Sequence, residues 1–335
     1  MRFPDSLRAF YRLFLHTQML PILESGEETL VGGQAVMEGV MMRAPHSYCV
    51  AVRKSGGELV TDTRALPRLS ERYPMCKLPI VRGVATLGQA MVLGYRALRF
   101  STEVAVEDMS PAPAAGARPA RKELPGWAIT GNLIFSLAFL IFLYKFVPLL
   151  VVTRLGKVYP ALGGRIAFNA ADGAIRIAIL LGFMYLLSRA KDIRRVFEYH
   201  GAEHKVVFNF EAGEAVTVAN AQRYSTFHPR CGTSFLMVLM FLAIPVYTLI
   251  PFGGFGARLA CRIVLLPLLV GLSYELIRFA ARHPGSLLAL VTAPGLWLQR
   301  ITTKPPSDDQ AAVAIHALEG AMALEKSQGG ELVIA

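Results

Sequence analysis

Four long apolar segments limit the folds open to this chain more than any other feature. They cover roughly residues 127–152, 173–189, 233–251 and 258–280, and a helix that crosses a bilayer needs about 20 mostly apolar residues. The second segment is the weakest, because it is short and contains Arg176. Charged residues make up 18% of the chain, whereas soluble proteins carry roughly 25%. The sequence therefore predicts an α-helical integral membrane protein with about four transmembrane helices.

The polar remainder predicts a small α+β cytoplasmic N-terminal domain. Residues 48–54 and 58–63 have the pattern of two hairpin strands, and the glycines between them can supply the positive φ angles of the turn. Residues 82–107 have helical periodicity but contain Arg96 and Arg99, so this helix is expected to be interfacial or packed. In chain order we expect a basic amphipathic helix (1–24), the α+β domain (25–109), a disordered Pro/Ala linker (110–126), transmembrane helices 1 and 2 (127–189), a cytoplasmic His-rich loop (190–232), transmembrane helices 3 and 4 (233–280), an interfacial or re-entrant segment (281–303) and a C-terminal helix and tail (304–335).

Positive charge predicts the orientation. The formal net charge is +11, and Lys and Arg mostly flank the apolar segments, which favours contact with lipid over nucleic acid. The loop between the second and third segments holds or borders seven basic residues, against three and two in the loops on the other side. By the positive-inside rule, we expect a multi-pass protein of the cell membrane with both termini in the cytoplasm. Its partner would be the lipid bilayer, and no nucleic acid is expected.

The C-terminal helix has a clear predicted start and a clear apolar face. Ser307 and Gln310 have the spacing of a capping box, in which each side chain satisfies the other residue's backbone N–H. Further along, Ile315, Leu318 and Met322 recur at helical spacing. The sequence therefore predicts a helix that begins near residue 308.

The stretch "EYHGAEHK" (198–205) contains a candidate metal site. If residues 191–209 are helical, His200 and His204 project from one face, a spacing that can place two imidazole nitrogens on one Zn²⁺ ion. Glu203 lies on the same surface and could act as general base, as in the His-x-x-Glu-His pattern of inverted-motif zinc proteases. In the alternative, this is a polar helix at the membrane surface whose charges form an exposed lattice of Arg194, Glu198, Glu203 and Lys205.

A catalytic zinc ion needs a third protein ligand and an open position. His228 and Cys231 are candidates, in "STFHPRCGTSF", where the chain returns to the membrane. None of the four cysteines forms a CxxC pair, so no disulfide framework is expected. Arg230 could hold an anionic headgroup or phosphate; the alternative for this stretch is a simple turn. Glu275, in the fourth segment, is either another ligand or the partner of Arg278.

The stretch "GGQAVMEGVMMRAP", near the N-terminus, is a second unusual motif. Gly32 and Gly33 permit unusual backbone geometry or a close approach of another segment. In a functional interpretation, Glu38 or Gln34 faces the histidines. In the alternative, the Met and Val residues are core and Glu38 pairs with Arg43.

Several of these motifs together resemble the YqhQ-like family, catalogued as domain of unknown function 1385, over about residues 27–325. The resemblance implies an integral membrane protein that is predicted to be a metal-dependent enzyme, without an assigned reaction. The motifs are "GGQAVMEGVMMR" (32–43), "RGVATLGQAM" (82–91), "EYHGAEHKVV" (198–207), "HPRCGTSF" (228–235) and "APGLWLQRITTKPPSDDQ" (293–310), and the family positions are Gln34, Glu38, His200, Glu203, His204, His228 and Cys231.

Three functions are compatible with these features. The leading hypothesis is a metal-dependent, hydrolase-type enzyme that acts at the cytoplasmic membrane face on a lipid-linked or membrane-protein substrate. The alternative is a non-enzymatic scaffold whose structural metal or polar cluster recruits a cytosolic partner. A transporter component is the third, and it would need a homo-oligomer. The residues assigned are His200, His204, His228 and Cys231 to a divalent metal (zinc), Glu203 and Glu38 to catalysis, and Gln34 and Arg230 to cofactor binding.

Overall fold

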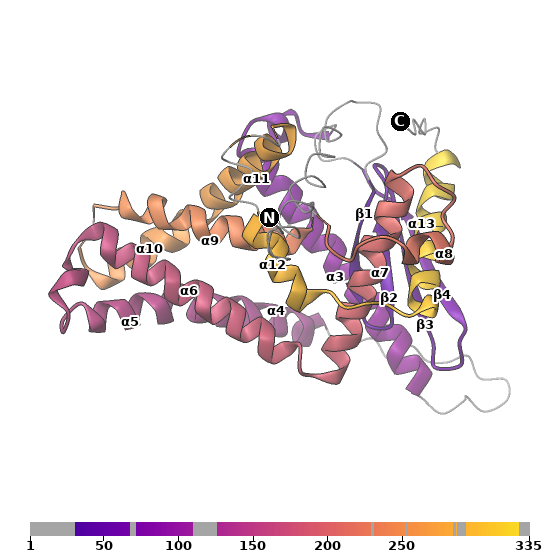
Figure 1. Ribbon diagram of the computed structural model, residues 1–335, viewed down its shortest axis with the longest axis horizontal. Helices are drawn as coiled ribbons and strands as arrows, with labels where there is room; N and C mark the ends of the chain where they lie inside the picture. Colours follow the sequence, from indigo (N-terminus) through magenta and orange to yellow (C-terminus); the bar gives the residue numbers. More distant parts are fainter. Residues whose placement is uncertain are drawn as a thin grey trace, which may run out of the picture.

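The protein has two parts, a small sheet covered by helices and an extended group of apolar helices (Figure 1). The computed structural model describes residues 31–67, 72–109, 126–228, 231–251, 253–283, 286 and 293–327. The predicted amphipathic helix at 1–24 and nearly all of the Pro/Ala linker lie outside these residues. The described elements are β1 (Gly32–Val36), β2 (Gly39–Arg43), β3 (Ser47–Arg53), β4 (Leu59–Ala65), η2 (Pro74–Lys77), α3 (Val81–Met109), α4 (Gly126–Ile141), η3 (Phe142–Phe146), α5 (Val147–Leu155), η4 (Pro160–Gly163), α6 (Arg165–Leu187), α7 (Lys191–Glu211), α8 (Val218–Gln222), α9 (Gly232–Thr248), α10 (Phe255–Val264), α11 (Leu266–Arg282), α12 (Ala293–Thr302) and α13 (Asp308–Ser327).

The sheet is an antiparallel meander in the order β1-β2-β3-β4. Its third hairpin, formed by β3 and β4, confirms the prediction, with Arg53 opposite Leu59 and Gly57 at a φ of 87° in the turn. The first hairpin has a two-residue turn of Met37 and Glu38, and the φ of Glu38 is 51°. A positive φ is uncommon for a residue other than glycine, so the sequence gives little warning of this turn.

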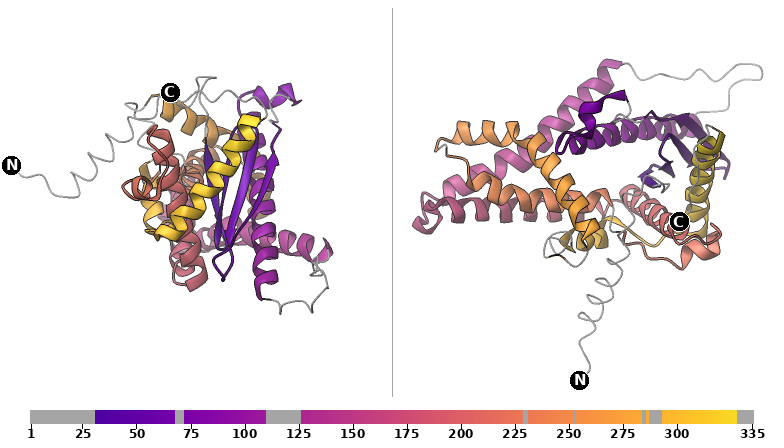
Figure 2. Two further views of the ribbon diagram at one scale, coloured as in Figure 1. Left: turned by 90° about the vertical axis from the view of Figure 1, so that its right-hand side faces the viewer. Right: turned by 90° about the horizontal axis from the view of Figure 1, so that it is seen from above.

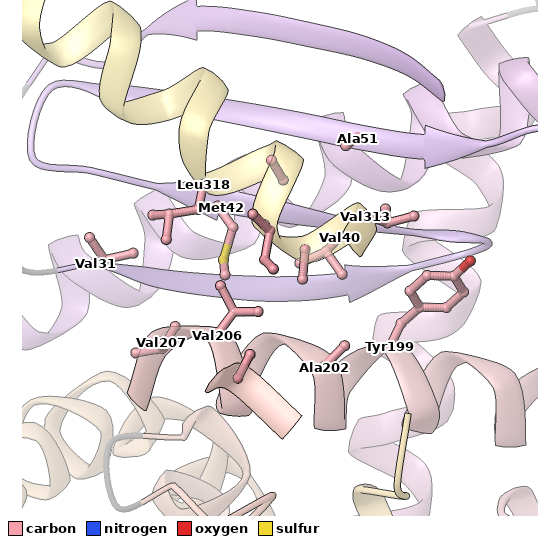
Figure 3. Close-up of a cluster of buried hydrophobic side chains, with 14 of the residues drawn as sticks. Val31, Val40, Met42, Ala51, Tyr199, Ala202, Val206, Val207, Val313 and Leu318 are labelled. Atoms are coloured by element: carbon pink, nitrogen blue, oxygen red, sulfur yellow. The ribbon is translucent and has the colours of Figure 1, made fainter. Parts of the chain in front are cut away.

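The two faces of the sheet bury different side chains, because neighbouring residues of a strand point to opposite sides. Val40 and Met42 pack against α7 and α13 (Figure 3), whereas Met41 and Val50 pack against α3 on the other face. Figure 2 shows α13 lying across the strands. The N-terminal strands, the middle loop and the C-terminal helix therefore share one core, although the chain separates them by the apolar helices.

The capping box at the start of α13 is confirmed. The backbone N–H of Ser307 donates to Oε1 of Gln310 at 2.9 Å, and the backbone N–H of Gln310 donates to Oγ of Ser307 at 3.3 Å. The predicted apolar face, Ile315, Leu318 and Met322, is buried in the core against the sheet and α7. This helix is therefore part of the folded core, and its apolar face is already covered.

The prediction of about four transmembrane helices is corrected to two or three among the described residues. Two stretches are long and apolar enough to cross a membrane, Ile134–Leu155 and Arg165–Leu187. The pair α10 and α11 would make a third if a 49° bend is allowed within one span. Apolar side chains of the first stretch are exposed, as lipid-facing side chains are, with Phe135 at 69% and Ile134 at 64%.

Helix breaks explain why the third and fourth segments fall short. The third, α9, is 17 residues long, which gives roughly 26 Å against the ~30 Å hydrocarbon core. It ends at Thr248, just before Pro251. In the fourth, Pro267 lies in the first turn of α11. Proline has no backbone N–H to donate to the preceding turn of α10, and this favours the bend between the two helices. Hydrophobicity alone does not reveal either break.

The segment after α11 is described in part, as α12. It packs against α9 and α6, with Leu298 and Gln299 buried and Trp297 55% exposed. Gln299 donates from Nε2 to the carbonyl of His228 at 2.7 Å and accepts that residue's backbone N–H at 2.8 Å. These bonds hold His228, three residues before Cys231, against α12.

Candidate metal centre

Helix α7 places the two motif histidines side by side, as the prediction of a helix over 191–209 required. The rings of His200 and His204 have centroids 4.4 Å apart. Cys231 is the N-cap residue of α9, and its Sγ lies 3.2 Å from Nε2 of His200. Ligand atoms of these three residues all lie within 4.8 Å of one another. Ligands of a tetrahedral Zn²⁺ site lie about 3.5 Å apart, given metal–ligand bonds of 2.0–2.3 Å, so one ion would fit among them.

Backbone carbonyl groups fix which nitrogen of each histidine carries the hydrogen. Nδ1 of His200 lies 2.8 Å from the carbonyl oxygen of Thr302, and Nδ1 of His204 lies 2.5 Å from that of Thr226. Since a carbonyl oxygen only accepts, each Nδ1 must be the donor, and Nε2 of the neutral ring keeps its lone pair. Metal-binding histidines are typically oriented in this way by an outer partner.

Glu203 is the carboxylate beside the two rings. Its Oε2 lies 3.9 Å from Nε2 of His200 and 3.8 Å from Nε2 of His204, and the residue is 7% exposed. Strand β1 lies directly against it: a Cβ on Gly33 would be 2.7 Å from Cγ of Glu203. The close approach predicted for the glycine pair is therefore confirmed at Gly33, which leaves space for the glutamate.

The alternative of an exposed charge lattice does not describe this helix. Arg194, which is exposed, and Glu198, which is half-buried, do form an i,i+4 contact of 3.6 Å. However, Glu203 and Lys205 are buried, and Nζ of Lys205 donates to the carbonyl groups of Gln222 and Tyr224 at 2.7 Å. The C-terminal half of α7 is thus an interior helix, with polar groups that bond to the surrounding chain.

His228 lies beside the cluster but outside the three-residue group. Its ring centroid is 5.6 Å from that of His204 and 4.4 Å from that of Phe208. Nε2 of His228 lies 3.4 Å from Oε2 of Glu211. His228 therefore packs beside His204 and Phe208, and the thiol of Cys231 is the third member of the donor group.

Acid is expected to destabilise the fold through His228. Burial lowers the pKa of His228 to about 4, while Glu203 raises it and His200 lowers it, both by smaller amounts. The unfolded chain takes up this proton near pH 6.5 and the folded chain only near pH 4. The stabilising contribution is therefore present above pH 6.5 and is lost as the pH falls, by roughly 3 kcal/mol at pH 4.

Urea unfolding of chelator-treated protein between pH 7 and pH 4 measures this effect. His228→Phe keeps a ring in the pocket but removes the titrating group, so its free energy of unfolding should depend less on pH. Equal pH dependence in the two proteins would contradict the assignment.

The predicted N-terminal site residues Glu38 and Gln34 contact residues other than the histidines. Glu38 accepts hydrogen bonds from Nε and Nη2 of Arg195, each 2.5 Å long, and lies 3.4 Å from the hydroxyl of Tyr199. Both partners belong to α7: Arg195 lies five residues before His200, and Tyr199 immediately precedes it. Gln34 packs against α3, where a Cβ on Gly94 would be 2.5 Å from its Oε1. Arg230 lies outside the described residues.

Glu275 has a partner that neither sequence alternative named. Its carboxylate accepts a bond of 2.6 Å from Nε of Arg82, a second from Nη2 of the same residue and one of 3.3 Å from the backbone of Ile80. This pair joins α11 to the start of α3. Glu275 therefore anchors the apolar helices to the sheet-packing helix and is not in the donor group.

Sequence reasoning missed Gly201 and the segment that it contacts. A Cβ on Gly201 would lie 2.0 Å from the carbonyl oxygen of Lys304, and the backbone N–H of Lys304 donates to the carbonyl of Phe197 at 2.9 Å. The glycine lets the chain after α12 lie directly on α7, which brings the Thr302 carbonyl to His200. Because Gly201 lies between the two motif histidines, it was the one sequence signal that could have indicated this close contact on α7.

Comparison with known proteins confirms the resemblance inferred from the motifs. The family described as "Protein of unknown function (DUF1385)" matches residues 78–324. The "Uncharacterized protein YqhQ" of Bacillus subtilis (strain 168) is 34% identical over 305 residues, which cover 88% of this chain and 92% of that protein. No solved structure matches. The chain belongs to the DUF1385 family of proteins of unknown function.

Proposed function

We propose that this protein is a membrane-embedded, metal-dependent enzyme of the hydrolase type. The observation that carries the proposal is the convergence of two histidines, each with its Nε2 lone pair kept available, on the thiol of Cys231. A donor set of two imidazoles and one thiolate suits Zn²⁺. His200, His204 and Cys231 would hold the ion.

The number of donors favours a catalytic site over a structural one. Structural zinc sites have four protein ligands, whereas catalytic sites have three and an open position. Among the described residues, the group contains three members, and His228 instead lies against Glu211. A scaffold with a structural metal would need His228 to turn toward the ion as a fourth ligand.

Glu203 is suited to move a proton in this site. When bound, a divalent ion of this kind supplies Lewis-acid chemistry and lowers the pKa of water. Oε2 of Glu203 lies within 3.9 Å of both imidazole Nε2 atoms and the side chain is almost out of solvent, so it can accept a proton from attacking water and pass it to a leaving group. Strand β1 at Gly33 limits where this side chain can go.

The position of α7 favours a substrate held in or on the membrane. Helix α7 begins at Lys191, just after the candidate span Arg165–Leu187 ends. Cys231 begins α9, another apolar helix. The donors would therefore lie close to the membrane surface, and the positive-inside rule assigns that surface to the cytoplasm. A lipid-linked or membrane-protein substrate fits this location.

Glu203→Gln separates binding of the metal from the chemistry. The variant keeps all three donors, so it is expected to hold as much zinc as the wild type while hydrolysis falls by about 10²–10⁴-fold. Zinc-loaded protein is incubated with membrane lipid and protein extract in water labelled with heavy oxygen, and labelled products are found by mass spectrometry.

The exposed glutamate Glu319 on α13 provides a matched control, since Glu319→Gln makes the same chemical change outside the donor group. Labelled products should form with wild type and with this control but not with Glu203→Gln. Products that form equally with all three proteins, or with none, would count against the enzyme.

A further inference from the structure

A basic pocket lies at the end of the apolar helices that is far from the sheet. Its volume is about 270 Å³, and it forms where α5, α6, α9 and α10 approach one another. Figure 1 shows these helix ends on the opposite side of the molecule from α7 and α13. The lining residues are Thr153, Gly156, Lys157, Leu162, Gly163, Arg165, Phe168, Asn169, Tyr247, Ile250, Arg258 and Arg262.

The lining is strongly positive. Among the described residues, it contains four basic side chains and no acidic one. Lys157 and Arg165 are exposed at the rim, and the guanidinium of Arg258 lies 4.6 Å from the ring centroid of Phe168. The helix dipoles do not decide whether the pocket prefers anions or cations. The N-terminal turns of α6 and α10, which carry partial positive charge, meet the C-terminal turns of α5 and α9, which carry partial negative charge. The side chains therefore set a preference for anions.

Arg262 forms the deep wall of the pocket and is held rigidly. It is 1% exposed. Nη1 donates to Oδ1 of Asp172 at 2.6 Å, Nη2 donates to Oδ1 of Asn169 at 2.9 Å, and the guanidinium lies 4.9 Å from the ring centroid of Tyr247. Nε of Arg262 is buried and has no hydrogen-bond partner among the described residues. A buried donor of this kind points to a ligand or water as its partner.

Positive charge also exceeds negative charge in the buried surroundings of Arg262. Arg176 and Lys145 are also buried and also face the ring of Tyr247, at 5.1 and 5.3 Å. In the described part of the chain, both guanidinium groups contact one carboxylate, that of Asp172. Two buried guanidinium groups thus share a single carboxylate, while Nζ of Lys145 donates to the hydroxyl of Tyr247 at 2.8 Å. Buried charge without compensation is costly in an apolar helix bundle. A second anion at Arg262 would offset this cost.

We propose that this pocket binds a phosphoryl group. Arginine forks match the oxygens of phosphate, and the rim charges suit an anion with more than one negative charge. Pockets of about 300–1,000 Å³ hold drug-sized ligands, so this smaller one suits a phosphate or a headgroup. The apolar lining by Leu162 and Ile250 would contact the carbon part of a lipid. Free phosphate and the phosphate of an anionic lipid are the two sources of this chemistry.

Removal of the rim charges tests the proposal without disturbing the buried pair. Full-length protein in neutral detergent is titrated with inorganic phosphate by calorimetry, and separately its thermal unfolding is followed in nanodiscs of phosphatidylcholine with or without phosphatidylglycerol. In the variant Lys157→Gln/Arg165→Gln, the affinity for inorganic phosphate is expected to fall by at least about tenfold. If the ligand is a headgroup, the variant should instead lose the stabilisation by phosphatidylglycerol.

The control removes two charges of similar exposure that do not line the pocket. Arg154→Gln/Arg189→Gln takes one from the end of α5 and one from the turn after α6. Phosphate binding in detergent identifies a free anion as the source, and stabilisation by phosphatidylglycerol alone identifies a headgroup. Absence of both effects in the wild type, or equal losses in the two double variants, would overturn the proposal. Arg262→Met, checked for helix content by circular dichroism, should abolish binding where the fold survives.

Discussion

Alanine at both His200 and His204 is expected to lower bound zinc from about one ion per chain to less than a tenth of that value. The two rings supply two of the three donors, so their loss leaves Cys231 without a second protein ligand in the group. A single thiolate does not retain zinc against dialysis. Elemental analysis of purified protein, after loading with zinc and dialysis, measures the change.

Two other histidines provide a matched control. His283 and His316 are exposed and far from the centre in the chain, so His283→Ala/His316→Ala should keep the full zinc content. X-ray absorption should give one sulfur at about 2.3 Å and nitrogens at about 2.0 Å from the metal, and Cys231→Ser should remove the sulfur. Zinc that stays bound in the His200/His204 variant would contradict the proposed metal centre.

His228→Ala distinguishes the catalytic site from the structural one. If three residues hold the ion, this variant keeps its zinc, because His228 is not a member of the donor group. A large loss of zinc would make His228 a fourth ligand and would favour the scaffold. The His200/His204 variant serves as the comparison, since both variants remove imidazole rings from the same region of the protein.

Gly201→Ala is expected to destabilise the protein by roughly 3 kcal/mol. The added methyl group would lie 2.0 Å from the carbonyl oxygen of Lys304, which is backbone and cannot rotate away. The segment after α12 must therefore shift, and the bonds from Lys304 to Phe197 and from His200 to Thr302 weaken with it. Thermal unfolding of metal-free protein measures the loss, and zinc affinity should fall in parallel.

Gly88→Ala is the control for this change. Gly88 is also inside a helix, α3, but a Cβ there would meet nothing within 4 Å. Alanine has a higher helix propensity than glycine, so this variant should gain up to about 1 kcal/mol. If Gly201→Ala were as stable as Gly88→Ala, the close contact between α7 and Lys304 would be wrong.

The parts of this structure that sequence could predict depend on local patterns. The helix that carries His200 and His204, the hairpin of β3 and β4 and the capping box of Ser307 all arise from residues within a few positions of one another. Their physical causes are periodicity, turn geometry and side-chain capping, each of which is visible in a short stretch. The donor pair was therefore predictable as a pair.

What sequence could not predict involves contacts between distant segments. Glu38 pairs with Arg195, which is 157 positions away, and Glu275 pairs with Arg82, which is 193 positions away. Sequence reasoning left Glu38 either facing the histidines or paired with Arg43, and it left Glu275 either a ligand or the partner of Arg278. A charge pattern does not say which distant partner the fold supplies. The number of spans was overestimated for a similar reason: hydrophobicity does not show where α9 ends or where α10 and α11 bend.

The two faces of α7 have a mechanical consequence. One face is fixed to the sheet through Tyr199 and Val206, while the other carries the histidines toward Cys231, which begins the apolar helix α9. The distance between the histidines and Cys231 therefore depends on how the sheet and α7 are positioned relative to α9. If the apolar helices cross a bilayer and the proposed ion is bound, a change in bilayer thickness that tilts these helices would alter the separation of the donors and, with it, the affinity for the ion.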